Sequence, residues 1–206
     1  MGGSRLLTTP DIPSKIIDAG EVLQHISRIV YRGSALYFGN DGTNRYDDPG
    51  KSYGVLYLGF ELRTALMESV FHKHQWHQRT RRTITRTEVG RRMVRAVGVV
   101  GDLHLADLTA PDVMASQFGL NLSQLASRRC IHTQRVSTTV HATVDAAGKS
   151  IFDGVLYPSR NNHPAACVAL FNRTDAKVDL LADIDLDQHV DWPDFITNYQ
   201  IVVLPK

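Results

Sequence analysis

Long apolar runs, paired cysteines and a strong net charge are all missing from this sequence. No apolar stretch in the 206 residues approaches the ~18–20 residues that a membrane-spanning helix needs. The first residues also lack the long apolar core of a secretory signal. The two cysteines, Cys130 and Cys167, form no C-x-x-C pair, which excludes a disulfide framework and fits small core residues in a reducing compartment. We therefore expect a cytoplasmic protein with no membrane partner.

The charge balance is close to neutral. Lys and Arg number 23 against 21 Asp and Glu, so no global field attracts nucleic acid or an anionic membrane. Hydrophobic residues make up 43% of the chain and charged residues 21%, which is the composition of an ordinary globular protein. With no internal repeat and no long linker, residues 1–206 are predicted to form a single domain.

Local patterns predict a mixture of strands and helices. The compact apolar run at 54–60 predicts a buried strand that passes directly into a helix. In this helix Leu62, Ala65, Leu66 and Ser69 recur at helical spacing and form one packed face, while Glu68 falls off that face. Strands are also expected at 92–100, 151–157, 167–171 and 201–204, and helical sequence at 11–28, at 109–119 and on to about Thr143. The mixture predicts an α/β or α+β fold.

Several short motifs, taken in order, carry a family resemblance. They are Ser27-Arg28-Ile29, Leu36-Tyr37-Phe38-Gly39, Asn44-Arg45-Tyr46-Asp47-Asp48-Pro49, Tyr53-Gly54-Val55-Leu56-Tyr57-Leu58-Gly59, Ala65-Leu66-Met67-Glu68-Ser69 and Asp153-Gly154-Val155-Leu156-Tyr157-Pro158-Ser159-Arg160. Their order and spacing resemble the RES-domain family, which is named after an arginine, a glutamate and a serine. The resemblance covers about residues 28–171 and leaves 172–206 as a C-terminal extension. Tyr46 departs from the tryptophan or phenylalanine common at its position.

The resemblance implies a fold and a function. It implies an ADP-ribosyltransferase-like fold, a split mixed β-sheet with flanking helices, that holds NAD as substrate in a cleft. It also implies the toxin of a toxin–antitoxin pair, neutralised by an Xre-like antitoxin. Family members degrade NAD by phosphorolysis or hydrolysis, and some are similar to enzymes that ADP-ribosylate a protein target. The sequence leaves open the acceptor of ADP-ribose, the identity of the antitoxin and the oligomeric state, for which a homodimer is one alternative.

The charged residue types suit cleavage of NAD. Arginine binds a pyrophosphate through paired, charge-assisted hydrogen bonds, and Arg28 and Arg45 are the candidates, with Arg32 as the alternative to Arg28. Breaking the nicotinamide bond develops positive charge on the ribose, as in glycoside hydrolysis. A carboxylate beside that carbon stabilises the charge, and Glu68 is the candidate. Arg28, Glu68 and Ser159 are thus predicted to be catalytic.

Hydroxyl and aromatic side chains complete the predicted site. Ser159 could hold a ribose hydroxyl or the carboxamide, and Tyr46 or Tyr57 could stack on the nicotinamide ring. The motifs place no histidine beside Glu68, so we expect an acceptor that needs no general base. Inorganic phosphate is such an acceptor, and Arg28, Arg45 and Arg160 would attract it.

Two further patterns indicate other functions. His72, His74 and His77 have spacing that suggests a metal site, but the helical period separates His74 from the other two and no fourth ligand is apparent, so we predict no metal. Seven arginines lie within 79–95, which makes a non-enzymatic module that binds nucleic acid or a protein the rival hypothesis. No aromatic residues are interleaved with these arginines, which favours a solvated hairpin or a surface for an acidic partner.

Overall fold

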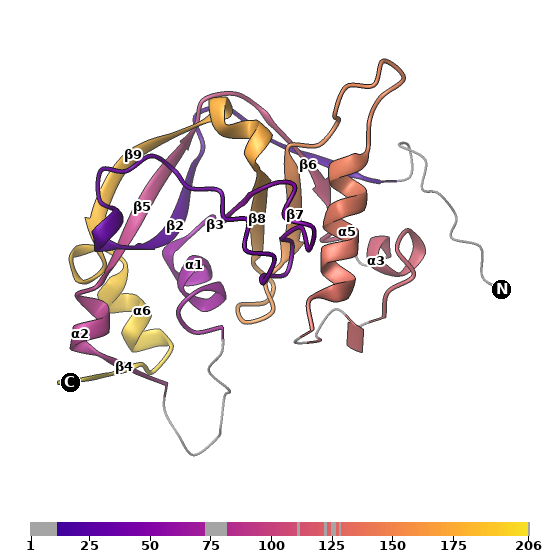
Figure 1. Ribbon diagram of the computed structural model, residues 1–206. Helices are drawn as coiled ribbons and strands as arrows, with labels where there is room; N and C mark the ends of the chain where they lie inside the picture. Colours follow the sequence, from indigo (N-terminus) through magenta and orange to yellow (C-terminus); the bar gives the residue numbers. More distant parts are fainter. Residues whose placement is uncertain are drawn as a thin grey trace.

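A single mixed sheet of eight strands forms the frame of the computed structural model (Figure 1). The structure describes residues 12–72, 82–110, 112–121, 123–124, 127 and 129–205. In sheet order the strands are β1 (Ser14–Ile17), β6 (Leu103–Asp107), β7 (Gly154–Pro158), β8 (Ala166–Phe171), β3 (Val55–Gly59), β2 (Val22–Arg28), β5 (Arg92–Val99) and β9 (Val178–Asp185). Only β6 and β7 pair in parallel among these neighbours; the other pairs are antiparallel.

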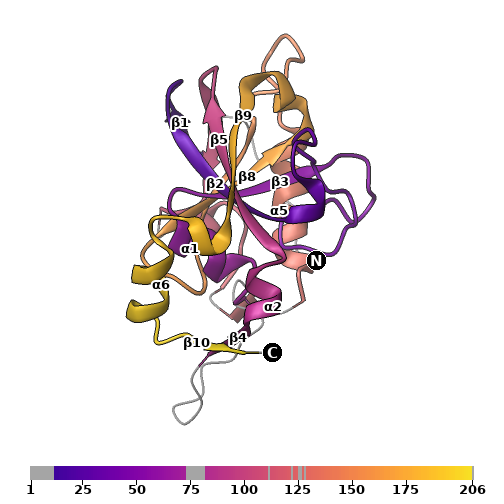
Figure 2. The same ribbon diagram turned by 90° about the vertical axis from the view of Figure 1, so that its left-hand side faces the viewer.

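Short helices and a small second sheet surround this frame. The helices are α1 (Leu62–Glu68), α2 (Arg86–Val89), α3 (Val113–Ser116), α5 (Ile131–Ala142) and α6 (Trp192–Asn198), with 3-10 turns at Ile29–Tyr31, Asn172–Lys177 and Leu186–Gln188. The second sheet pairs β4 (Thr83–Thr85) with β10 (Val202–Leu204) in parallel, and Figure 2 shows it beyond α2 at one end of the molecule. The single-domain α+β fold predicted from the sequence is confirmed.

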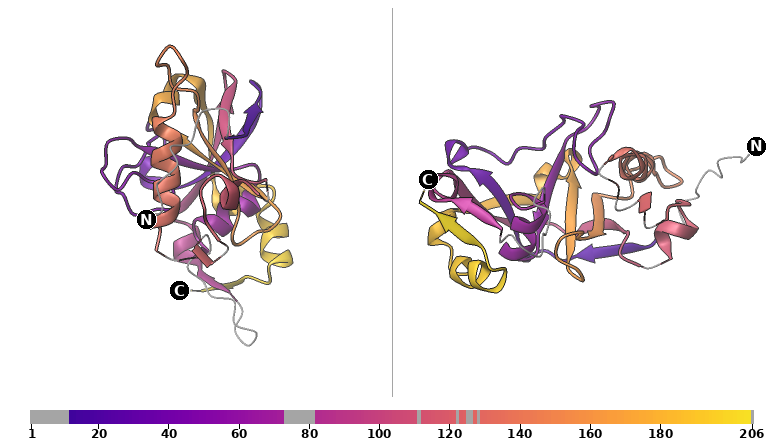
Figure 3. Two further views of the ribbon diagram at one scale, coloured as in Figure 1. Left: turned by 90° about the vertical axis from the view of Figure 1, so that its right-hand side faces the viewer. Right: turned by 90° about the horizontal axis from the view of Figure 1, so that it is seen from below.

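Two groups of helices cover one face of the sheet. Val136 and Val140 of α5 pack with Val155 and Phe171 over β7 and β8, and Figure 3 shows α5 running along that half. Helices α1 and α6 pack together over β2 and β5 instead, in a cluster that contains Leu62, Leu66, Ile26, Val94, Trp192 and Phe195. The opposite face buries a third cluster, which includes Leu23, Leu58, Val97, Leu105 and Leu170. The candidate site lies on the first face, where the two helical groups meet.

The sheet is split between β2 and β3. These strands share one paired position, Gln24 with Gly59, and then diverge. Helix α1 begins just after the split and approaches β3 closely at Gly59. A Cβ at Gly59 would lie 2.7 Å from the Ala65 backbone nitrogen, so only glycine permits this approach. The split and the glycine together fix where α1 ends, and therefore where Glu68 lies.

The helical sequence predicted for 11–28 is wrong. The segment forms β1 and β2, and β2 pairs with β5 in unbroken register from Val22–Gly98 to Arg28–Arg92. The sequence looked helical because its apolar residues Leu23 and Ile26 are three positions apart, whereas a strand buried on one face has apolar residues at every second position. Both side chains are buried. Both faces of this part of the sheet are covered, Leu23 lying in the third cluster and Ile26 under α1, so strand alternation is lost.

The arginine-rich segment is also not the solvated hairpin that the sequence predicted. Its described part runs through β4, α2 and β5, and β4 pairs with β10 rather than with its chain neighbour. Arg95 is only 2% exposed, and its Nε donates to Asp183 Oδ1 at 2.8 Å. Arg92 is paired with Glu88. At least two of the seven arginines therefore serve the fold.

Candidate active site

Helix α1 places Glu68 at its last helical position. Leu62, Ala65 and Leu66 bury the inner side of the helix, as their spacing predicted. Ser69 caps the end, its Oγ donating to the Ala65 carbonyl at 2.5 Å. Glu68 is half-buried, off the packed stripe, so its carboxylate reaches sideways from α1 toward the end of β7.

A turn after β7 holds one oxygen of the Glu68 carboxylate. Glu68 Oε1 accepts from Ser159 Oγ at 2.7 Å, from the backbone N–H of Arg160 at 2.9 Å, and from the backbone N–H and Nδ2 of Asn161 at 3.1 and 3.2 Å. Ser159 Oγ in turn accepts from the backbone N–H of Asn162 at 2.9 Å, which closes the turn. Successive backbone N–H groups in a turn make an anion-binding concavity. We call residues Ser159, Arg160, Asn161 and Asn162 the cradle.

The cradle orients the carboxylate and leaves its other oxygen available. No described residue hydrogen-bonds to Glu68 Oε2, since all four donors converge on Oε1. Charge-assisted hydrogen bonds to an ionised carboxylate are about twice as strong as neutral ones, so four of them restrain its rotation. Glu68 thus presents a fixed negative charge through Oε2. Ser159 has its hydroxyl proton committed to Glu68, which makes it a support of the carboxylate and not a free nucleophile.

Arg45 lies near this carboxylate, over two neighbouring tyrosine rings. Its Cζ is 5.3 Å from the centroids of both Tyr46 and Tyr157, and the rings are themselves 4.5 Å apart. The side chain is 9% exposed, yet its Nε and Nη1 have no hydrogen-bond partner among the described residues. Burial acts to lower the pKa of the guanidinium, but the two rings and Glu68 outweigh it and raise the pKa. Arg45 is therefore a buried cation with unused donors.

A second arginine adds positive charge to the same place. Arg160 belongs to the cradle, and its Nη1 donates to the Ser127 carbonyl at 3.1 Å. Burial lowers its pKa, and the charge of Arg45 lowers it further while Glu68 opposes the change. Two cations that repel each other beside unused donors are stabilised by an anion. The donor set fits a phosphate or pyrophosphate group.

Tyr57 holds the loop that carries Arg45. Its hydroxyl donates to Asp47 Oδ1 at 2.8 Å and accepts from the Tyr46 backbone N–H at 2.9 Å. Asp47 Oδ2 also accepts from the backbone N–H groups of Thr43 and Asn44, which fixes the start of the loop. Burial, followed by the Asp47 charge, raises the pKa of Tyr57 well above its ordinary value. The hydroxyl therefore stays protonated and pins the loop.

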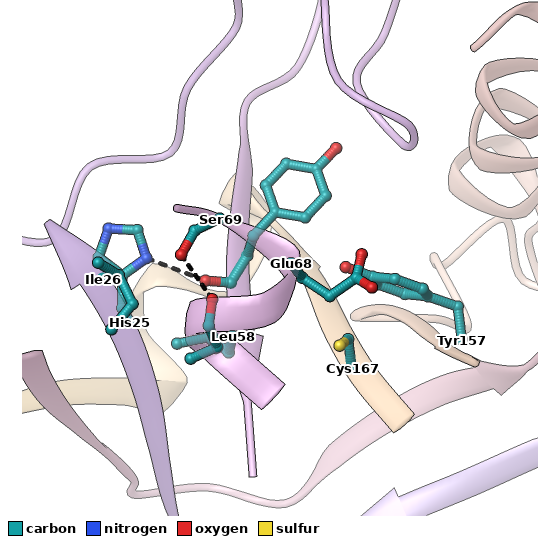
Figure 4. A pocket seen from close by; sticks show the side chains of 9 residues that line it. His25, Ile26, Leu58, Glu68, Ser69, Tyr157 and Cys167 are labelled. Atoms are coloured by element: carbon teal, nitrogen blue, oxygen red, sulfur yellow. Dashed lines mark hydrogen bonds between the residues drawn. The ribbon is translucent and has the colours of Figure 1, made fainter. Parts of the chain in front are cut away.

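A cavity of ≈ 70 Å³ opens beside Glu68 at the split between β2 and β3 (Figure 4). Its lining consists of His25, Ile26, Tyr57, Leu58, Ala65, Glu68, Ser69, Tyr157 and Cys167. A water molecule needs about 10–15 Å³ by this measure, so the cavity holds a few waters or one end of a larger ligand. Figure 4 shows the Glu68 carboxylate at one end, close to Tyr157 and Cys167, and His25 at the other.

Sequence reasoning missed His25. Its Nδ1 lies 2.9 Å from the Tyr57 carbonyl, which can only accept, so Nδ1 carries the proton and Nε2 is an acceptor. The imidazole replaces the ladder bond that β3 loses where β2 diverges. Burial lowers the pKa of His25, so the ring is neutral near pH 7. The motifs placed no histidine beside Glu68, and His25 lines the same cavity only at its other end.

Tyr157 and Cys167 were missed as well. Tyr157 belongs to one of the family motifs, but nothing in the sequence showed that its ring packs at a tilt against Tyr46 and covers Arg45. Cys167 lines the cavity, and burial with the Glu68 charge raises the pKa of its thiol to about 12. The thiol is therefore protonated at neutral pH and is not a nucleophile.

A comparison with protein families identifies the family of the chain. The model of the RES domain matches residues 22–193. The chain belongs to the RES-domain family. The match starts at β2 and continues past Asn172, where the sequence-based resemblance had ended, into the first turn of α6. A comparison with curated proteins finds no match.

Of the three residues that the sequence resemblance assigned to the family name, Glu68 and Ser159 meet, but Arg28 lies elsewhere. Its side chain is 49% exposed at the end of β2, and its Nη2 is 3.8 Å from Glu88 Oε1. Arg28 is not among the residues that line the cavity. Arg32, the alternative, donates through Nη1 to the Asp183 carbonyl at 3.1 Å and forms an ion pair with Asp185. Of the arginines predicted to bind the pyrophosphate, Arg45 is therefore the one that lies near Glu68.

The structure describes only part of the residues that bear on the metal-site and membrane predictions. His74 and His77 lie outside the described residues. Within the described residues, no group of three or more His, Cys, Asp or Glu side chains could hold a metal ion. In the same residues, no helix has the length and hydrophobicity needed to cross a membrane.

Proposed function

We propose that this protein cleaves NAD at the bond between nicotinamide and ribose. The observation that carries the proposal is the pairing of an oriented carboxylate with an unsatisfied buried cation. Within the part of the chain that the structure describes, Glu68 has one oxygen held by four donors and the other unengaged, and Arg45 nearby has two buried nitrogens without a partner. NAD is a ligand with a pyrophosphate and a ribose that becomes positively charged as its nicotinamide departs. Membership of the RES-domain family supports the same substrate.

Each site residue then has a role in the proposed reaction. Arg45, aided by Arg160, binds the pyrophosphate, and its orphaned donors gain the acceptors that they lack. Glu68 Oε2 stabilises the positive charge that develops on the ribose, and Ser159 keeps the carboxylate in place. Preorganised charge of this kind costs no reorganisation during the reaction. The rings of Tyr57 and Tyr157, which line the cavity, provide the aromatic surface for the nicotinamide end, whereas Tyr46 is buried behind them at 1% exposure.

Phosphate is the acceptor that this site favours. It is already anionic and needs no general base, and Arg45 and Arg160 attract it. His25 does not replace such a base at Glu68, because Figure 4 shows it at the opposite end of the cavity. The products would be nicotinamide and ADP-ribose-1″-phosphate, with slow hydrolysis when phosphate is absent. Depletion of NAD would arrest growth, as expected of a toxin held inactive by an Xre-like antitoxin that blocks the site.

One experiment tests the reaction and its acceptor together. Purified protein is incubated with NAD, with and without phosphate, and the products are identified by mass spectrometry. Phosphate-stimulated release of nicotinamide with ADP-ribose-1″-phosphate supports the proposal. Transfer of labelled ADP-ribose to a protein at a rate independent of phosphate would make the enzyme an ADP-ribosyltransferase instead. A protein that leaves NAD intact in every arm would refute NAD cleavage altogether.

A further inference from the structure

Tyr199, near the C-terminus, is connected to the cradle through one side chain. Its hydroxyl donates to Asn162 Oδ1, and Asn162 Nδ2 donates to Thr64 Oγ1 at 2.9 Å. Thr64 lies on α1 one turn before Glu68 and is 1% exposed. The Asn162 amide is therefore bonded at both ends, by α1 on one side and by the C-terminal segment on the other.

Asn162 also shapes the part of the cradle that touches the carboxylate. Its backbone N–H donates to Ser159 Oγ at 2.9 Å, and its carbonyl accepts from the Ala165 N–H at 2.9 Å. Ser159 Oγ then donates to Glu68 Oε1. A path therefore runs from Tyr199 to the Asn162 side chain, and from the Asn162 backbone through Ser159 to Glu68. Because the side chain and backbone of Asn162 are joined covalently, fixing the amide also fixes where its backbone N–H lies.

The segment that carries Tyr199 is built to hold it still. Helix α6 ends in a Schellman motif: the Ile201 N–H donates to the Ile196 carbonyl at 2.8 Å, and the Gln200 N–H to the Thr197 carbonyl at 3.2 Å. Gln200 supplies the left-handed residue with φ 49°. The Tyr199 ring stacks on Phe195 with centroids 4.9 Å apart.

The anchoring continues on both sides of Tyr199. Trp192, Phe195 and Ile201 are buried against α1, and β10 pairs with β4. Because this segment is anchored on both sides, the hydroxyl of Tyr199 can restrain the Asn162 side chain to which it donates.

From this geometry we infer that Tyr199 is a positioning residue for the candidate active site, acting through Asn162 on the cradle that orients Glu68. The family match ends at residue 193, so Tyr199 lies beyond the part of the chain that the RES domain accounts for. The C-terminal segment thereby becomes part of the catalytic support of this protein. This inference rests on the proposed function for its kinetic consequence, whereas its structural consequence, a looser cradle, does not.

The test removes one hydroxyl. In Tyr199→Phe the ring and its stacking on Phe195 remain, and the Asn162 amide loses one partner. A hydrogen bond contributes a factor of about 3 to 10, so we expect kcat for NAD cleavage to fall by about that factor while KM changes less than twofold. Backbone amide exchange of Arg160 and Asn161, followed by NMR, should quicken by a similar factor.

Two further variants separate positioning from general stability. Thr174→Val is the matched control, because Thr174 Oγ1 donates to the Phe171 carbonyl at 2.7 Å in a fully buried position. It should lower Tm without changing kcat or the exchange of Arg160 and Asn161. In an Asn162→Ala background, Tyr199→Phe should have no additional effect on kcat or exchange, since the path is already cut.

Every outcome decides the matter. If Tyr199→Phe behaves like Thr174→Val, with a lower Tm and unchanged exchange at Arg160 and Asn161, Tyr199 only packs and the inference is wrong. Additive effects in the double variant would also overturn it. If the wild-type protein leaves NAD intact, the proposed function fails, but the amide exchange still confirms or refutes the link from Tyr199 to the cradle.

Discussion

Glu68 and Glu88 both lie in short helices and both collect several donors, but the donors differ in kind. Glu68 Oε1 receives two backbone N–H groups, a serine hydroxyl and a side-chain amide, all from one closed turn. Glu88 Oε1 receives the Nε and Nη2 of Arg92, with Arg28 at 3.8 Å. One carboxylate is held by the fold, and the other by long side chains on the surface.

The difference in donors determines how firmly each carboxylate is oriented, and an oriented carboxylate is the one suited to catalysis. Backbone donors in a formed turn lose no side-chain entropy, so they fix an orientation at little cost. Exposed ion pairs are worth about 0–1 kcal/mol, because ordering two long side chains offsets their attraction. Arg28 can therefore leave Glu88 for a better anion, whereas Glu68 cannot leave the cradle. The comparison predicts large effects at Glu68 and its neighbours and progressively smaller ones toward Glu88.

Glu68→Gln should have the largest effect. The amide oxygen can still accept from the cradle, but the negative charge is lost, and loss of one preorganised electrostatic group costs about 100- to 1000-fold in kcat. Nicotinamide release measures the loss, with Tm as the check on folding. Glu68→Ala is the less clean variant, because it leaves the cradle donors without an acceptor and should lower Tm as well. Near-normal turnover in folded Glu68→Gln would remove Glu68 from the mechanism.

Arg45→Ala should follow. Loss of a charged hydrogen-bond pair is worth about 1.5–3 kcal/mol, which predicts a decrease of roughly 10- to 150-fold in kcat/KM for NAD. Arg45→Lys keeps the charge but loses the planar group that lies over the two tyrosine rings, so it should recover only part of the activity. Arg135→Ala, an exposed arginine on α5, is the control. Equal effects of Arg45→Ala and Arg135→Ala would exclude Arg45 as an NAD ligand.

The sequence predicted those parts of the site that depend on local pattern. The unit of β3 and α1 followed from an apolar run and a helical stripe, which are short-range signals, and it placed Glu68 correctly at the edge of the stripe. The contact between Glu68 and Ser159 joins residues 91 positions apart. Only the family resemblance connected them, since periodicity carries no information about such pairs.

The features that the sequence did not predict were missed for physical reasons. β2 is covered on both faces and lost its alternation, and β9 joins the sheet through pairing with β5 alone, which no local pattern encodes. The backbone N–H groups of the cradle are invisible in a sequence because nearly every residue type has one. Arg28 was assigned to the site by motif order, and the structure places it on the surface with Glu88.

Arg28→Ala should therefore have a smaller effect than Arg45→Ala. Arg28 lies outside the cavity lining and would act on NAD only after leaving Glu88, so we expect a decrease of about 3- to 10-fold in kcat/KM, the range of one ordinary hydrogen bond. Arg32→Ala, which removes the ion pair with Asp185, should leave kcat/KM unchanged. A larger effect at Arg32 than at Arg28 would reverse the choice between these two arginines.

Glu88→Gln should produce the smallest effect, and in the opposite direction. The variant loses the charge that attracts Arg28 and Arg92, whose strand positions face each other in the register of β2 and β5. Stability should change by less than about 1 kcal/mol, because the pairs are partly exposed. If Arg28 can turn to NAD, its release should lower KM by about two- to threefold, and 0.5 M salt should abolish the difference by screening.

The control for Glu88→Gln is Asp185→Asn, which removes the ion-pair partner of Arg32 and should leave KM unchanged. Glu88→Gln releases Arg92 together with Arg28, so a difference in KM between the two variants reports on this pair of arginines. A higher KM in Glu88→Gln would mean that Glu88 presents Arg28 to the substrate instead of competing for it. Glu88 would then support the site as the cradle does, and the contrast between the two carboxylates would not hold.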